Sequence, residues 1–254
     1  LSAGEVDKLQ EIPWRDNLTF ANKAMDRMRK EIPQPGFRGG FGPVADGVNV
    51  PKGEFFSNPN SHESEIPLLI CTTFHEWGAT RTNPQLEAGG PEQAIEALKG
   101  RFGDKAAEVY QAYAANFPGK KPAEIMTLAA SNRANAVACA NAKVKQKAPV
   151  YMAWFGWEPN LYNGRMRAFH CIDICFWFNN TDRMYTHTGG GKRPRVLAEK
   201  MSDSLLAFMR KGNPNSPGLN NWPKFSASLG ETMVINDVSQ VQNDPDREAR
   251  KALP

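Results

Sequence analysis

The sequence predicts an α/β protein built on a largely parallel sheet. Two continuous apolar and β-branched runs, at 66–74 and 149–157, have the length and composition of strands buried on both faces. Blocks with helical periodicity separate and follow these runs, which is typical of a sheet covered on both faces by helices. Only two or three central strands are visible, and such a small sheet would leave an edge exposed. We therefore expect the chain to form part of a larger sheet.

The first quarter of the chain is expected to be helical and then irregular. Residues 4–11 and 19–31 are predicted helices separated by a Pro-Trp turn. Glycine and proline predict a loop at 33–43, and the segment VADGVNVP that follows is predicted to be extended, with an Asp-Gly turn. A polar loop at 57–65 leads into the first buried strand.

The middle of the chain is predicted to be mostly helical. Alanine-rich composition and helical spacing, interrupted by glycine and proline, favour helices over strands here. In order, the predicted elements are a loop at 82–91, helices at 91–100, 104–116 and 122–146, the strand at 149–157, and a loop at 158–165.

The last quarter contains a well-formed amphipathic helix. A glycine-rich loop at 186–194 precedes residues 195–212, whose apolar side chains fall near one helical face and whose last turn is followed by Gly212. Further along, 231–237 and 238–244 are predicted to form a terminal hairpin or a pair of edge strands.

Composition and charge exclude several classes of protein. The chain of 254 residues is 41% hydrophobic, carries a net charge of +4 and scatters its basic residues, so nothing supports nucleic-acid binding. No apolar run reaches the roughly 18 residues that span a bilayer. The start, LSAGEVDKLQ, resembles no signal peptide and lacks a methionine, so we expect it to lie downstream of the gene product's own start. The compartment stays open, with a lean towards a secreted or periplasmic one.

The four cysteines do not define a redox or metal motif. No two of them form a C-x-x-C pair, and we expect most of them to be buried free thiols, while a disulfide stays open. They are Cys71, Cys139, Cys171 and Cys175.

Two loops at the carboxyl ends of the predicted strands carry candidate catalytic residues, as expected for open α/β sheets. FHEWGATRT (74–82) contains Glu76, and EPNLYNGRMRAFH (158–170) ends at His170. A carboxylate that orients an imidazole, which then deprotonates a hydroxyl, is the working half of a nucleophilic triad. Taken singly, Glu76 is also explained as a solvated loop acid, and His170 as a core histidine bonded to the backbone.

Motifs for metals and phosphates are incomplete. Position 79 is alanine where H-E-x-x-H needs histidine, and Arg193 stands where a P-loop needs Ser or Thr. The carboxylates show no pairing typical of a glycosidase. We therefore predict no metal and no cofactor. The remaining histidines, which stand alone in polar loops and are predicted to lie at the surface, are His62, His75 and His187.

Five segments of the chain together resemble one enzyme family. IPLLICTTFHEWG resembles its strand and acid loop, and RAFHCIDICFWFNN resembles its histidine segment. The family is the type B carboxylesterases, the cholinesterase-like and para-nitrobenzyl esterase-like branch of the α/β-hydrolases. The resemblance runs from about residue 40 to the C-terminus, and its other segments are GPVADGVNVP, PVYMAWFGW and WPKFSASLGETMVIND.

The resemblance implies a fold and two site residues. It implies an α/β-hydrolase fold, with 1–254 as the C-terminal portion of a single domain. It maps the triad acid to Glu76 and the triad histidine to His170, and Asp173 is expected to be structural. The aromatic side chains near these loops, which we expect to pack in the core rather than line an acyl pocket, are Trp77, Phe169 and Trp177.

Two positions depart from the family pattern. HEWG (75–78) has one residue between the acid and the glycine, which could shift the loop backbone. Cys171 follows the histidine where the family often has glycine, so a side chain stands where close packing is usual.

The sequence contains no Gly-x-Ser-x-Gly turn to supply a nucleophile. The glycines at 189–191 follow the histidine, whereas an oxyanion loop precedes it. Since triad order in this fold is serine, acid, histidine, we expect the serine upstream of Leu1. It would lie in a separate chain, a cleaved piece or a preceding segment.

The resemblance implies a carboxylic ester hydrolase that acts on a small-molecule ester through an acyl-enzyme. This chain would supply the acid and the histidine, an N-terminal half would supply the serine, and the chain alone would be inactive. Two alternatives stay open: a non-catalytic binding or adhesion protein of the same fold, and an inactive fragment. The presence of both Glu76 and His170 favours the hydrolase.

Overall fold

The computed structural model describes residues 3–31, 46–50, 52, 62–78, 83–219 and 221–254. The chain divides into two compact units, Leu1–Phe55 and Phe56–Pro254. The loop predicted at 33–43 lies outside the described residues, as do both ends of VADGVNVP and most of the loop at 57–65. The predicted Asp-Gly turn is present, since Asp46 accepts the amides of Val48, Asn49 and Val50 and Gly47 has a φ of +80°. Within the described part, no helix is long and apolar enough to cross a membrane.

The first unit contains a short 3₁₀ segment, η1 (Ala3–Gln10), and helix α1 (Trp14–Glu31). Helix α1 begins five residues before the predicted start, because the carbonyl of Pro13 already accepts hydrogen bonds from the amides of Asp16 and Asn17. None of its residues is buried.

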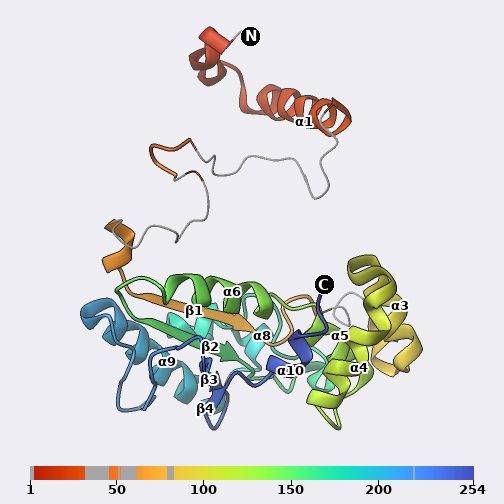
Figure 1. Cartoon of the computed structure of the whole chain (residues 1–254), viewed down its shortest axis with the longest axis vertical. Coiled ribbons are helices and arrows are strands. Elements are labelled where there is room, and N and C mark those ends of the chain that lie inside the picture. Colours follow the sequence, from red (N-terminus) through yellow and green to blue (C-terminus); the bar gives the residue numbers. More distant parts are fainter. Residues whose placement is uncertain (1–2, 32–45, 51, 53–61, 79–82, 220) are drawn as a thin grey trace. The chain divides into compact units, whose positions relative to one another are not determined.

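A four-stranded sheet of order β1-β2-β3-β4 forms the centre of the second unit and confirms the predicted α/β class (Figure 1). Strands β1 (Leu68–Thr73), β2 (Val150–Phe155) and β3 (Glu231–Ile235) run parallel, and β4 (Gln240–Asn243) is antiparallel to β3. The predicted terminal hairpin is therefore confirmed.

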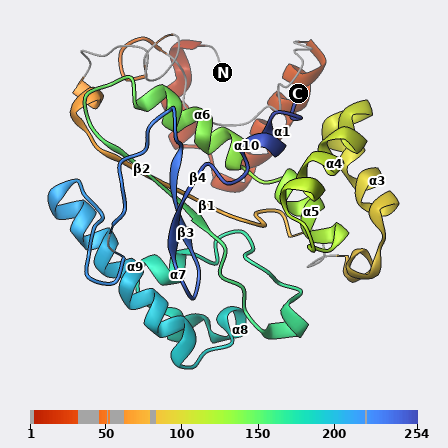
Figure 2. The same cartoon turned by 60° about the horizontal axis from the view of Figure 1, so that its bottom comes forward.

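Both faces of strand β2 are covered, and all six of its residues are buried. Tyr151, Ala153 and Phe155 pack in one cluster with α7 (Ile174–Trp177) and α9 (Lys192–Lys211). Successive side chains of a strand point to opposite faces, so its other residues pack against different helices. Val150 and Met152 contact α6 (Arg133–Lys143). Trp154 packs in a separate cluster with α3 (Pro91–Phe102), α4 (Ala106–Asn116) and α5 (Pro122–Ala129). Figure 2 shows α6 and α9 on opposite sides of the sheet.

The other elements of this unit are short connections and small helices. They are η2 (His62–Glu65), η3 (Pro84–Ala88), α3 (Pro91–Phe102), η4 (Gly103–Lys105), α4 (Ala106–Asn116), α5 (Pro122–Ala129), η5 (Leu161–Gly164), η6 (Thr181–Met184), α8 (Tyr185–Thr188) and α10 (Arg247–Arg250).

Two predictions about these elements are wrong, and a third holds in part. The helix predicted at 122–146 is two helices, α5 and α6, with a break at 130–132. Both faces of strand β1 contact the core, as predicted, but its first four residues are only half-buried because β2 is its only partner in the described residues. That agrees with the exposed edge expected of a small sheet. The glycine loop contains α8, and α9 starts three residues early, at Lys192.

Gly212 ends helix α9 as predicted, and its conformation requires glycine. Its φ is +65° and its amide donates to the carbonyl of Phe208 at 2.7 Å. A Cβ here would also lie 2.8 Å from Cγ of Pro67.

The prediction that most cysteines are buried is wrong, although all four are free thiols. Only Cys175 is buried. Cys71 lies on the edge strand β1, and Cys171 is exposed in a turn after His170.

Candidate active site

Backbone pairing beyond β1 brings the two predicted site residues together. The amide of His75 donates to the carbonyl of Ala168 at 3.0 Å, and His75 forms an isolated parallel bridge with Phe169. Glu76 and His170 each follow a bridged residue directly. Two segments far apart in the sequence therefore present Glu76 and His170 side by side.

The two side chains are hydrogen-bonded. Nδ1 of His170 lies 2.7 Å from Oε2 of Glu76, and Oε1 of Glu76 accepts the amide of Thr73 at 2.8 Å. Since a carboxylate only accepts, the proton of the neutral ring is on Nδ1 and its Nε2 carries a lone pair. The Glu76 side chain is 9% exposed and the His170 side chain 52% exposed. The buried carboxylate of Glu76 therefore holds Nδ1 of an imidazole that is itself half-exposed.

Trp77 covers one face of this ring. The rings of Trp77 and His170 stack with centroids 5.1 Å apart and an angle of 26° between their planes. Trp77 is half-exposed, so the prediction that it packs in the core is wrong. Trp77, which stands between the acid and the glycine of HEWG, therefore stacks its indole against the imidazole of His170. Phe169 and Trp177 are buried core residues, as predicted.

The residues after His170 form a tight turn. Cys171 has φ of +68°, in the left-handed region that glycine adopts most readily. A side chain at this φ strains the backbone. Because the Cys171 side chain is exposed, it does not crowd the core, and the expectation of close packing at this position is wrong. Asp173 accepts a hydrogen bond from the Trp177 indole at 3.2 Å, and burial raises the pKa of its carboxyl. These contacts fit a structural role for Asp173.

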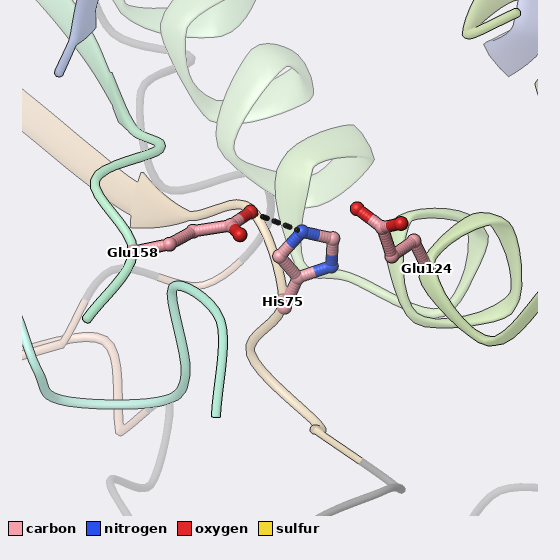
Figure 3. Close-up of side chains that lie close together, drawn as sticks. All are labelled: His75, Glu124 and Glu158. Carbon is pink, nitrogen blue, oxygen red and sulfur yellow. Dashed lines mark ion pairs between the residues drawn. The ribbon is translucent and has the colours of Figure 1, made fainter. Parts of the chain in front are cut away.

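A second His–Glu group adjoins the first (Figure 3). His75 is fully buried, so its prediction as a surface histidine is wrong. Its Nδ1 lies 2.7 Å from the hydroxyl of Thr127, and its Nε2 lies 3.4 Å from Oε1 of Glu158. Glu124 faces the ring from α5, and one ligand atom from each of the three ionisable residues lies within 4.8 Å of the others. Burial lowers the pKa of His75, and Glu158 opposes that shift.

Few local signals in the sequence point to this second group. Glu158 directly follows the predicted strand at 149–157, and the rule that reactive groups follow parallel strands could have singled it out. His75 stands between buried Thr73 and Glu76 in a segment that continues β1, which could have indicated burial. Nothing in the helical pattern of α5 distinguishes Glu124 from a solvated acid.

Comparison with known proteins decides the family. A model of the carboxylesterase family matches residues 18–252 of the chain. The chain belongs to this family. This carboxylesterase-family chain is 29% identical to a para-nitrobenzyl esterase of Bacillus subtilis (strain 168), over all of the chain and 50% of that protein. It is 28% identical to a phenmedipham hydrolase of Pseudarthrobacter oxydans, over 78% of the chain and 40% of that protein.

Solved structures establish the α/β-hydrolase fold. A thermophilic para-nitrobenzyl esterase matches the whole chain with a TM-score of 0.65 and 28% identity, over 51% of its own length. An esterase from Clostridium hathewayi, described as able to hydrolyse aliphatic aromatic polyesters, matches with a TM-score of 0.76 and 24% identity, over 49% of its length. The chain therefore spans about half the length of the relatives it matches.

Proposed function

We propose that the chain is the acid-and-histidine half of a serine carboxylic ester hydrolase. The observation that carries this proposal is the 2.7 Å hydrogen bond between Glu76 and His170, with the acid buried and the imidazole half-exposed. Membership of the carboxylesterase family supports the same reaction class.

The geometry supports a specific role for each member of the pair. His170 Nε2 accepts the proton of a serine hydroxyl as its oxygen bonds to the ester carbonyl carbon, and the alcohol then leaves with that proton. Water attacks the acyl-enzyme in the same way and restores the serine. Glu76 holds the Nδ1–H tautomer and stabilises the imidazolium, while the Thr73 amide fixes the carboxylate.

The nucleophile and the oxyanion hole come from outside this chain in the proposal. The sequence contains no Gly-x-Ser-x-Gly turn, and the chain spans about half of its relatives. A small carboxylic ester is the proposed substrate. A non-catalytic relative would need neither a buried acid nor an ordered imidazole, so the hydrogen-bonded pair favours the enzyme.

The test compares the chain with its longer form. We would express residues 1–254 alone, and the same residues joined to the segment that precedes them in the gene, and measure hydrolysis of a short-chain chromogenic ester. Turnover is expected from the longer protein and not from the chain alone. A preceding segment without a nucleophile turn, or a longer protein without turnover, would leave the binding-protein alternative.

A further inference from the structure

Among the described residues, one ring nitrogen of the buried His75 has no hydrogen-bond partner. The Thr127 hydroxyl lies 3.2 Å from the Ala123 carbonyl oxygen and 3.0 Å from that of Glu124, so its single hydrogen is donated within helix α5. The hydroxyl therefore accepts a hydrogen bond from Nδ1–H of His75. Nε2 of the neutral ring is left with a bare lone pair and, among the described residues, makes no hydrogen bond.

This lone pair points at an acid. Nε2 lies 3.4 Å from Oε1 of Glu158, and two electron-rich atoms at that distance repel unless a cation lies between them. Two ligands of a tetrahedral zinc ion, with bonds of ~2.0–2.1 Å, also lie about 3.4 Å apart. A metal-bound histidine ordinarily donates its other ring N–H to an oxygen, which is the role that Thr127 fills here.

We propose that His75, Glu124 and Glu158 bind one Zn²⁺ ion. One nitrogen and two carboxylate oxygens are a ligand set that zinc accepts, with water at the fourth position. The proposal is independent of the esterase assignment, since neither Glu76 nor His170 takes part. The ion would join the ends of β1 and β2 to helix α5, one residue away from the acid that orients His170.

Glu124 is the ligand that must move. Its Oε1 accepts Lys120 Nζ at 2.8 Å and its Oε2 accepts the amide of Lys121 at 3.0 Å. Figure 3 shows its carboxylate beside the imidazole, so a rotation of the side chain would bring an oxygen to an ion held by the other two residues. Lys120 therefore competes with zinc for this carboxylate.

The carboxylates around the site are paired with cationic side chains, with which a metal ion would compete. The cationic side chains that act on His75 are Lys120 and Arg167. Arg167 is held by a bidentate pair with Glu87, at 2.8 Å for both contacts. Glu87 also pairs with Lys121 at 2.9 Å, and Arg167 lies 3.7 Å from Glu124. The local carboxylates and cations therefore balance, and zinc must displace Lys120 from Glu124.

An ion has a route to the site. Glu158 and Lys120 both line a polar cavity of about 470 Å³, with Asn160 and Asn236 among the other lining residues. The Glu158 side chain is 33% exposed, although His75 itself is fully buried. Zinc and its water ligand would enter from this cavity.

The test is a calorimetric titration of the metal-stripped 254-residue chain with Zn²⁺. A Cys171→Ser background removes the exposed thiol, which is a competing ligand. We expect one Zn²⁺ per chain. His75→Asn should abolish binding, Glu158→Gln should weaken it at least about tenfold, and Lys120→Met should strengthen it because a competing cation is gone. His187→Asn, in a half-buried histidine outside the cluster, is the matched control and should bind as the background does.

The outcomes separate the proposal from its alternatives. If His75→Asn fails to fold, as judged by circular dichroism, the zinc affinities of Glu158→Gln and Lys120→Met test the proposal instead. Both side chains are partly exposed, so we expect these variants to fold. Absence of zinc binding in the background would overturn the proposal and leave a proton between His75 and Glu158. Equal affinity in Glu158→Gln and His187→Asn would overturn it as well, because the ion would then bind elsewhere.

Discussion

His75 and Glu76 are adjacent in one loop, and each belongs to a different His–Glu pair. The histidine is the more buried member of one pair, and the glutamate is the more buried member of the other. His75 is a buried imidazole that meets Glu158, whereas Glu76 is a buried carboxylate that meets the half-exposed imidazole of His170. An open ring with a bare Nε2 can take a proton from an incoming hydroxyl. A ring that is fully buried cannot meet an external nucleophile, and its lone pair requires a partner inside the protein. Burial of the ring, rather than the presence of a His–Glu contact, is therefore what distinguishes the two proposed roles.

Replacing His170 is expected to have the largest effect on catalytic activity. In the longer, active protein, His170→Ala should lower kcat for a short-chain ester by about 10⁶-fold, because the general base is lost. Steady-state kinetics measure this, with His187→Ala as the control that keeps activity. Wild-type turnover in His170→Ala would remove His170 from the mechanism.

The acid of the exposed pair comes next. Glu76→Gln keeps an oxygen for the Thr73 amide but no longer fixes the Nδ1–H tautomer of His170, so kcat should fall about 10⁴-fold. The fall should appear in kcat with little change in KM. Glu158→Gln, the equivalent change in the buried pair, should leave kcat within a few-fold of wild type. Equal losses in the two variants would mean that the pairs are not functionally distinct.

A third prediction concerns the ion pair that stands near both groups. Arg167 precedes His170 by three residues and lies 3.7 Å from Glu124, and its hydrogen bonds lower the pKa of Glu87 to about 2. A carboxyl with a depressed pKa in the folded state adds stability above pH 4.5, and this stability is lost as the pH falls towards 2. Glu87→Gln should therefore cost about 2 kcal/mol at pH 7.

The measurement is urea unfolding of the 254-residue chain across this pH range. The wild-type advantage over Glu87→Gln should shrink as the pH falls from 4.5 and disappear near 2. The surface variant Glu248→Gln, whose pair with Lys251 is exposed, should show almost no difference. A Glu87→Gln deficit that does not vary with pH would contradict the ion-pair explanation.

The smallest expected effect tests the indole on the exposed ring. Trp77→Ala removes the stacked face of His170 and should lower kcat/KM a few-fold, since such contacts contribute about 0.5–1 kcal/mol at exposed sites. Trp77→Phe keeps an aromatic face and should retain most of the activity. If both variants match wild type, the stack has no part in positioning His170.

The sequence predicted the framework of this site because its signals are local. Strands β1 and β2 are continuous apolar runs, the terminal hairpin alternates, and family membership was indicated by the segments around Glu76 and His170. The break between α5 and α6 was missed because alanine-rich helical periodicity continues across residues 130–132.

The second His–Glu group could not be predicted from local patterns. Its members come from the end of β1, from α5 and from the end of β2, and only the tertiary packing brings them together. His75 looked like a surface residue because the loop around it is polar. It is buried because Thr127 and Glu158 approach it from segments 52 and 83 positions away, which no single-sequence pattern records.

In the proposed mechanism, His170 and Glu76 activate a serine that lies outside this chain. Labelling of the longer protein with a fluorophosphonate probe, followed by peptide mapping, tests it most directly. We predict one labelled serine, located upstream of Leu1, and loss of labelling in His170→Ala. A labelled residue within 1–254, or full labelling of His170→Ala, would contradict the account.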